Sequence, residues 1–199
     1  MRTIDDCTAV ILAGGESRRM GEDKAAILLA GEPLLNRAIQ SVQPLFEHLL
    51  ISVREPREHL FFPQLCDRGE GGGPMMGIST ALERVNTPWV FVLACDMPFI
   101  SAEMICAMSE RLAEQQVVVA VVDGVVQPLA AFYAKSSLPL MSKQIASGDR
   151  SLQRLIKQTD ATFIDWEDLR PFDSERLSFM DLDSKQDVAK AEGILRSMK

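Results

Sequence analysis

The chain has 199 residues, 47% of them hydrophobic, with 28 acidic against 21 basic side chains and a net charge of −7. This length suits one domain with a substantial core, and we expect a single domain over residues 1–199. The acidic balance argues against nucleic acid as a partner, and the absence of a bilayer-length apolar run or a secretory signal predicts a cytoplasmic protein without membrane contact.

Apolar runs of strand length alternate with segments of helical periodicity along the chain. The predicted strands are residues 8–13, 49–53, 89–94, 117–122, 129–133, 162–164 and 179–182. The predicted helices are residues 34–46, 76–85, 101–115, 138–146, 151–158 and 184–198. Because most of the strands lack polar alternation, they are expected to be buried on both faces. The order predicts an α/β fold, a mostly parallel twisted sheet with helices on both faces, whose ligands bind beyond the carboxyl ends of the strands.

The first predicted strand leads into a glycine-rich loop, LAGGESRRMGEDKA over residues 12–25. Gly14 and Gly15 allow backbone N–H groups to approach an anion closely, and Arg18, Arg19 and Lys24 would neutralise it. The pattern predicts a bound polyphosphate. It is neither G-x-x-x-x-G-K-[ST] nor G-x-G-x-x-G, and the alternative is a strand-to-helix turn with solvated charges.

A second glycine cluster follows Asp67 and opens a predicted helix at residues 71–77. Its backbone groups could hydrogen-bond a base or ribose without interference from side chains. An ionised carboxylate accepts hydrogen bonds only, so Asp67 could accept from the amine and ring N–H of a guanine. The alternative is a surface loop with a solvated aspartate.

Aspartates also stand at two other predicted strand ends. Asp96 follows an apolar strand and precedes Pro98, a position where Mg²⁺ ligands occur in α/β enzymes. Asp181 and Asp183 are spaced two apart and would share one strand face, so one of them could complete a magnesium site with Asp96. The alternatives are a turn or helix cap at Asp96 and a solvated strand end at residues 181–183.

Other segments carry weaker signals. Gln127 could touch an acceptor substrate, and Arg150, in a glycine turn before a helix, could contact an anion. The four cysteines form no C-x-x-C pair and do not cluster with the two histidines, so structural zinc has little support. Each cysteine has apolar neighbours and is expected to be a small buried thiol.

The chain resembles the molybdenum cofactor guanylyltransferases, within the nucleotidyltransferase-like α/β superfamily. The resemblance runs nearly end to end. It rests on the long motif at residues 12–25 and on short motifs in the same order downstream, at Gly73-Pro74, Gly77-Ile78, 95–98, 127–129 and 151–152.

The resemblance implies a Rossmann-like nucleotidyltransferase fold with GTP, the molybdopterin cofactor and Mg²⁺ as ligands, and transient contact with cofactor-delivery proteins. The nucleotide-binding residues would be Leu12, Ala13, Gly14, Gly15, Lys24, Asp67 and Asp96. Asp96, with Asp183, would hold the metal, while Lys24 and Arg18 or Arg19 would stabilise the leaving pyrophosphate. Gly14, where related cytidylyltransferases have alanine, would leave room for guanine.

One departure from the family pattern keeps alternatives open. Guanylyltransferases tend to have Asn-x-Asn-Thr-Pro-Glu-Asp near the C-terminus, whereas this chain reads DLDSKQD over residues 181–187. The resemblance as a whole still implies transfer of GMP from GTP to molybdopterin, with release of pyrophosphate. The alternatives are a nucleotidyltransferase that uses CTP with another phosphorylated acceptor, and a non-catalytic GTP-binding adaptor.

Overall fold

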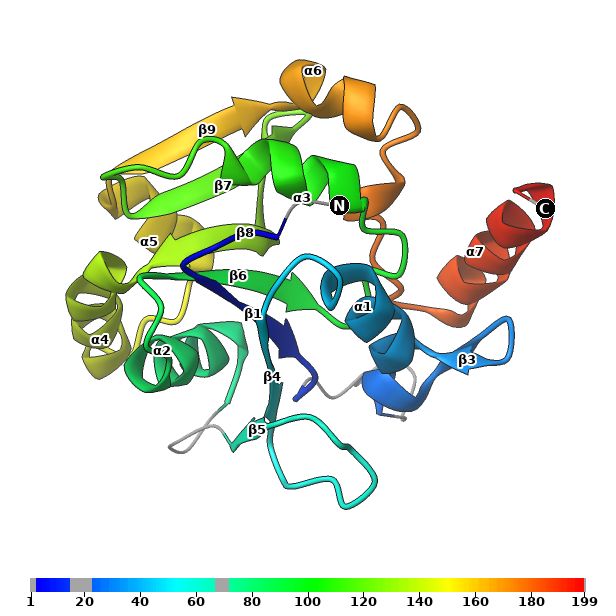
Figure 1. Ribbon diagram of the computed structural model, residues 1–199, viewed down its shortest axis with the longest axis horizontal. Coiled ribbons are helices and arrows are strands. Elements are labelled where there is room, and N and C mark those ends of the chain that lie inside the picture. The colour runs from blue at the N-terminus through cyan, green and yellow to red at the C-terminus, as the bar shows by residue number, and fades with distance from the viewer. Residues whose placement is uncertain (1–2, 15–22, 67–71, 199) are drawn as a thin grey trace.

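A seven-stranded sheet forms the centre of the molecule, in a computed structural model that describes residues 3–14, 23–66 and 72–198 (Figure 1). The strands are β1 (Cys7–Leu12), β4 (His48–Val53), β5 (Gln64–Cys66), β6 (Trp89–Ala94), β7 (Val117–Val122), β8 (Val125–Ala134) and β9 (Ala161–Asp165). Their order is β5-β4-β1-β6-β8-β7-β9, and β8 alone of the seven runs opposite to its neighbours. The α/β fold class is confirmed.

Helices cover both faces of this sheet, as expected. They are α1 (Leu34–Val42), α2 (Pro74–Arg84), α3 (Ala102–Ser109), α4 (Leu138–Ala146), α5 (Leu152–Gln158), α6 (Trp166–Leu169) and α7 (Lys185–Ser197). Helices α1, α3 and α6 share one hydrophobic cluster with the sheet, and α2, α4 and α5 share another on the opposite face. Successive strand residues point to opposite faces, so Phe91 joins the first cluster and Val90 and Val92 join the second.

Helix α7 lies apart from these two layers, beyond α1 and β3 in Figure 1. It packs against a short hairpin of β2 (Leu28–Leu29) and β3 (Glu32–Pro33), which sequence inspection missed. The hydroxyl of Ser184 accepts a hydrogen bond from the N–H of Asp187, and Ser101 caps α3 in the same way through Met104.

Strand β8 is longer than predicted and forms a hairpin with β7 through Asp123 and Gly124. Both turn residues have positive φ, +50° and +77°, which is the backbone that an Asp-Gly turn favours. This hairpin explains why β8 runs antiparallel within an otherwise parallel sheet.

The predicted strand at residues 179–182 is wrong. A 3₁₀ helix over Leu177–Phe179 occupies its start, because the Asp173 carboxylate accepts from the N–H groups of Leu177 and Ser178 and folds the backbone into a turn. Beyond it, Leu182 donates to the carbonyl of Asp96 in a loop rather than joining a strand ladder.

Two helices end earlier than the sequence predicts. Helix α3 stops at Ser109 and α1 at Val42, and turns follow each. The last buried residue within α3 is Met108. The expectation of four buried thiols holds for Cys7 and Cys95 only. Cys66 is exposed because it ends the edge strand β5, and Cys106 is partly exposed. Among the described residues, no helix has the length and apolar character to cross a membrane.

Candidate nucleotide site

A cavity of about 220 Å³ lies at the carboxyl ends of β1, β4 and β6, beside the start of α2. The strands and the segments that follow them contribute Leu12, Gly14, Ser52, Arg54, Ala94 and Asp96. The register explains this convergence, because Leu12 is paired with Ser52 on one side and with Ala94 on the other. The three chain segments therefore leave the sheet at the same level.

The ammonium group of Lys24 lies between two carboxylates at this cavity. Its Nζ is 2.6 Å from Oδ2 of Asp96 and 2.5 Å from Oδ1 of Asp183. The side chains of Lys24 and Asp96 are 16% and 14% exposed, and that of Asp183 is 48% exposed. The structure thus brings together three of the predicted site residues from positions far apart in the sequence.

Two opposing effects act on the Lys24 ammonium. Burial by itself lowers the pKa of Lys24, but the hydrogen bonds from Asp183 and Asp96, together with their negative charges, raise it above its ordinary value. Lys24 is therefore a fixed positive charge, unsuited to act as a general base near neutral pH.

Asp96 is held by the strand that precedes it. The N–H of Cys95 donates to the carbonyl of Leu12 (3.2 Å), and the N–H of Met97 donates to that of Ala94 (3.2 Å). Burial, followed by the charge of Asp96, raises the pKa of the Cys95 thiol to about 12. Cys95 therefore stays protonated near neutral pH and packs in the core rather than serving as a nucleophile.

Asp183 reaches the site through its neighbour Leu182. That leucine is fully buried in the cluster beneath α7, and its N–H donates to the carbonyl of Asp96 at 3.0 Å. For Asp181, two residues earlier, burial and then the charge of Asp183 raise the pKa of its carboxyl above the ordinary value. Of the two aspartates, Asp183 is the one at the cationic centre.

The start of α2 adds a second kind of positive potential. Gly72 and Gly73 have positive φ values of 49° and 104°, backbone that L side chains rarely adopt. Pro74 then begins the helix, and Gly73 and Pro74 line the cavity. The first N–H groups of an α-helix carry a partial positive charge, so this end of α2 is suited to an anion or a polar edge.

Gly14 packs against the end of β4. A Cβ added at Gly14 would lie 3.4 Å from both Cγ and N of Arg54, which is close van der Waals contact. The space beside Gly14 is therefore shared with Arg54. The prediction that this space accommodates guanine stays a prediction.

The remaining predicted residues divide into two groups. Gly15, Arg18, Arg19 and Asp67 lie outside the described residues, so their predicted roles stay predictions. The two weaker candidates, Gln127 and Arg150, are not among the residues that line the cavity. Gln127 donates to the carbonyl of Val125, and Arg150 donates to the carbonyl of Gly72 at 3.4 Å.

Sequence inspection missed Ser52 and Arg54, both of which line the cavity. The rule that ligands bind beyond the carboxyl ends of parallel strands applied equally to the strand ending at Val53. Since that strand lies next to β1, this rule could have pointed to residues 52–54.

Comparisons with known proteins identify the family of this chain. The model of the MobA-like NTP transferase domain matches residues 9–162. A probable molybdenum cofactor guanylyltransferase of Carboxydothermus hydrogenoformans is 31% identical over 179 residues, covering 89% of this chain and 90% of the relative.

Solved structures share the architecture. Molybdopterin-guanine dinucleotide biosynthesis protein A from Archaeoglobus fulgidus superimposes with a TM-score of 0.86 at 25% identity, over the whole of both chains. The 2-C-methyl-D-erythritol 4-phosphate cytidylyltransferase of Thermus thermophilus gives 0.70 at 16% identity, over 95% of this chain and 98% of that one, which shows a common fold alone. The chain belongs to the MobA-like NTP transferase family, among the molybdenum cofactor guanylyltransferases.

Proposed function

We propose that the protein transfers GMP from GTP to the molybdopterin cofactor and releases pyrophosphate. The observation that carries this proposal is that Lys24, which lines the cavity, contacts both Asp96 and Asp183 in a chain from this family. A terminal phosphate oxygen of the acceptor attacks the α-phosphorus of GTP. A new P–O bond forms as the bond to the pyrophosphate breaks.

Such a transfer needs alignment and charge neutralisation rather than a protein nucleophile. Lys24 supplies a permanent positive charge for the phosphates, and the partial positive charge at the N-terminal end of α2 favours the same anion. Arg18, Arg19, Gly15 and Asp67 are assigned to the same substrate by the family motif.

Magnesium fits the donor set of this site. Lys24 contacts one oxygen of Asp96 and one of Asp183, so both carboxylates already face a common cation. Mg²⁺ prefers carboxylate oxygens and is commonly held by one or two of them together with substrate phosphates. Bound there, it would neutralise charge on the phosphates. No group of three acidic, cysteine or histidine residues suited to a metal occurs in the described part of the chain.

A CTP-dependent transferase is the second candidate, because Asp181 and Asp183 replace the asparagines of the guanylyltransferase pattern. Contact with cofactor-delivery proteins stays a prediction.

The test is incubation with Mg²⁺ and molybdenum-loaded molybdopterin, in parallel with GTP, CTP, ATP and UTP. The expected result is pyrophosphate release and a guanine dinucleotide cofactor with GTP alone. Turnover with CTP would favour the second candidate. GTP binding without pyrophosphate release would favour an adaptor and contradict the proposal.

A further inference from the structure

The loop between β4 and β5 contains an arginine that reaches across to the nucleotide site without lining the cavity. Arg57 Nη1 is 2.6 Å from Oδ2 of Asp23, and its Nη2 donates to Oδ1 of Asp23 at 3.1 Å and to the carbonyl of Ala13 at 2.9 Å. Ala13 directly follows β1, and Asp23 directly precedes Lys24. One guanidinium therefore ties the end of the first strand to the residue before the site lysine.

Arg57 is itself held in place. Its N–H donates to Oε1 of Gln64 at 2.8 Å, and Nε2 of Gln64 donates back to the Arg57 carbonyl at 2.9 Å. Gln64 begins strand β5, which is paired with β4. The reciprocal amide contacts fix the Arg57 backbone to the sheet, so the guanidinium is presented from a rigid support.

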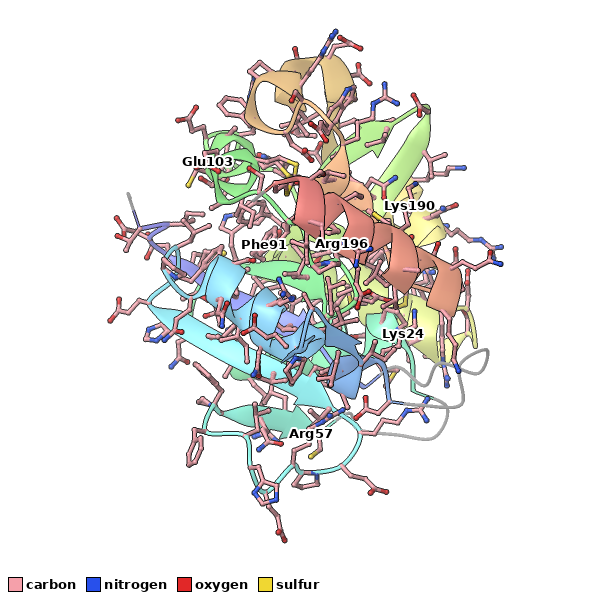
Figure 2. The ribbon with its side chains drawn as sticks, turned by 90° about the vertical axis from the view of Figure 1, so that its right-hand side faces the viewer. Lys24, Arg57, Phe91, Glu103, Lys190 and Arg196 are labelled. Carbon is pink, nitrogen blue, oxygen red and sulfur yellow. The ribbon has the colours of Figure 1, made fainter. Side chains whose placement is uncertain are left out.

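Asp23 transmits this position to Lys24. Its Oδ1 accepts from the N–H of Ala25 and caps the 3₁₀ helix η1 (Lys24–Ala26). The backbone of Lys24 thus begins a turn whose cap is fixed by Arg57. The lysine side chain then extends to Asp96 and Asp183 on other parts of the fold. In the view of Figure 2, Arg57 is labelled below Lys24.

We propose that Arg57 is a positioning residue that acts through Asp23 to fix Lys24 for nucleotidyl transfer. This inference rests on the proposed function. A guanidinium suits the role because its planar fork can bind both oxygens of a carboxylate and still donate to a carbonyl, whereas an ammonium is a point charge without a fixed fork of donors. A small displacement of a charge at a phosphoryl-transfer site lowers kcat strongly.

The first experiment measures kcat and the KM for GTP in Arg57→Ala, Arg57→Lys and Asp23→Asn. The asparagine retains an oxygen for the Ala25 N–H but loses the ion pair, so it separates positioning from capping. We expect kcat to fall about tenfold or more in Arg57→Ala, with a smaller change in KM, and to recover in part in Arg57→Lys. The double variant Arg57→Ala/Asp23→Asn should be no worse than the poorer single variant. Multiplied effects would show that the two residues act separately and would overturn the proposal.

Arg176→Ala is the matched control. Arg176 also binds a carboxylate, that of Asp123 (2.8 and 2.7 Å), but in the β7–β8 turn away from Lys24. It should change the midpoint of thermal unfolding little, because both side chains of this pair are largely exposed, and it should leave kcat unchanged. A fall in kcat that simply follows thermal stability across all variants would indicate a structural role only.

A second readout requires no turnover. Mild acetylation of the ligand-free protein, followed by peptide mass spectrometry, reports the accessibility of each lysine. Lys24 should react faster in Arg57→Ala and Asp23→Asn than in wild type, and at the wild-type rate in Arg176→Ala. Unchanged Lys24 labelling in Arg57→Ala would overturn the positioning role. If wild-type protein releases no pyrophosphate, the proposed function fails, and the labelling still decides on Arg57.

Discussion

The two carboxylates that meet Lys24 come from contrasting parts of the molecule. Asp96 follows β6, a strand whose six residues are all buried and which is paired on both sides. Asp183 follows an irregular segment and precedes α7, which buries a single residue, Ala191, and contacts the rest of the fold through a small cluster. The difference suggests a fixed ligand on the sheet and a second ligand that depends on docking of the C-terminal segment.

The largest expected effect is that of Asp96→Asn. It removes the charge of the more buried carboxylate while preserving its shape, and should lower kcat by about 10³-fold because charge neutralisation carries this reaction. Pyrophosphate release checks it, with thermal unfolding as a control for the fold. Near-normal turnover would remove Asp96 from the site.

The next largest effects are expected from truncating a buried leucine near each carboxylate, Leu93 before Asp96 and Leu182 before Asp183. Leu93→Ala in β6 should lower the free energy of unfolding by about 3–4 kcal/mol, and Leu182→Ala by about 2–3 kcal/mol, since the smaller cluster can collapse more easily around the lost side chain. Urea unfolding measures both. Leu182→Ala should in addition lower kcat, because Leu182 places Asp183. An equal loss of stability with unchanged kcat would contradict the docking role of this segment.

Asp183→Asn should have a smaller effect than Asp96→Asn. Its side chain is 48% exposed against 14% for Asp96, so solvent screens its charge more strongly. We expect a fall in kcat of about tenfold. An effect as large as that of Asp96→Asn would show that the two carboxylates contribute equally and would contradict the proposed difference between them.

The smallest expected effect is that of pH on the Lys24 contacts. Because the folded-state pKa of Lys24 is raised, its contribution to stability is fully present below the unfolded pKa of about 10.4 and is lost only as pH rises through the raised value. The difference in unfolding free energy between wild type and Lys24→Met should therefore stay constant from pH 6 to 9. A decline within that range would show that the ammonium loses its proton there.

The sequence was most informative where a residue's environment follows from its own segment. The apolar runs around Val10 and Val92 predicted buried parallel strands, and Asp96 followed from its place at a strand end. The hairpin of β7 and β8 could also have been predicted, because Asp123-Gly124 is a typical sequence for a tight turn between two strands.

Other features depend on contacts between distant segments and could not be read locally. The carboxylate of Asp173 converts the expected strand at residues 179–182 into a turn, and Leu182 finds its partner in the loop of Asp96. Arg57 gains its role only because Ala13 and Asp23 lie beside it in the fold.

The sheet order has a consequence for how the chain folds. The interior strand β1 obtains both neighbours from later in the sequence, β4 and then β6, and Lys24 meets carboxylates 72 and 159 residues downstream. Contacts of such long sequence separation close large loops and slow folding. During synthesis, Lys24 can contact Asp183 only after almost the whole chain has been made. The site around Lys24 is therefore among the last parts of the fold to form.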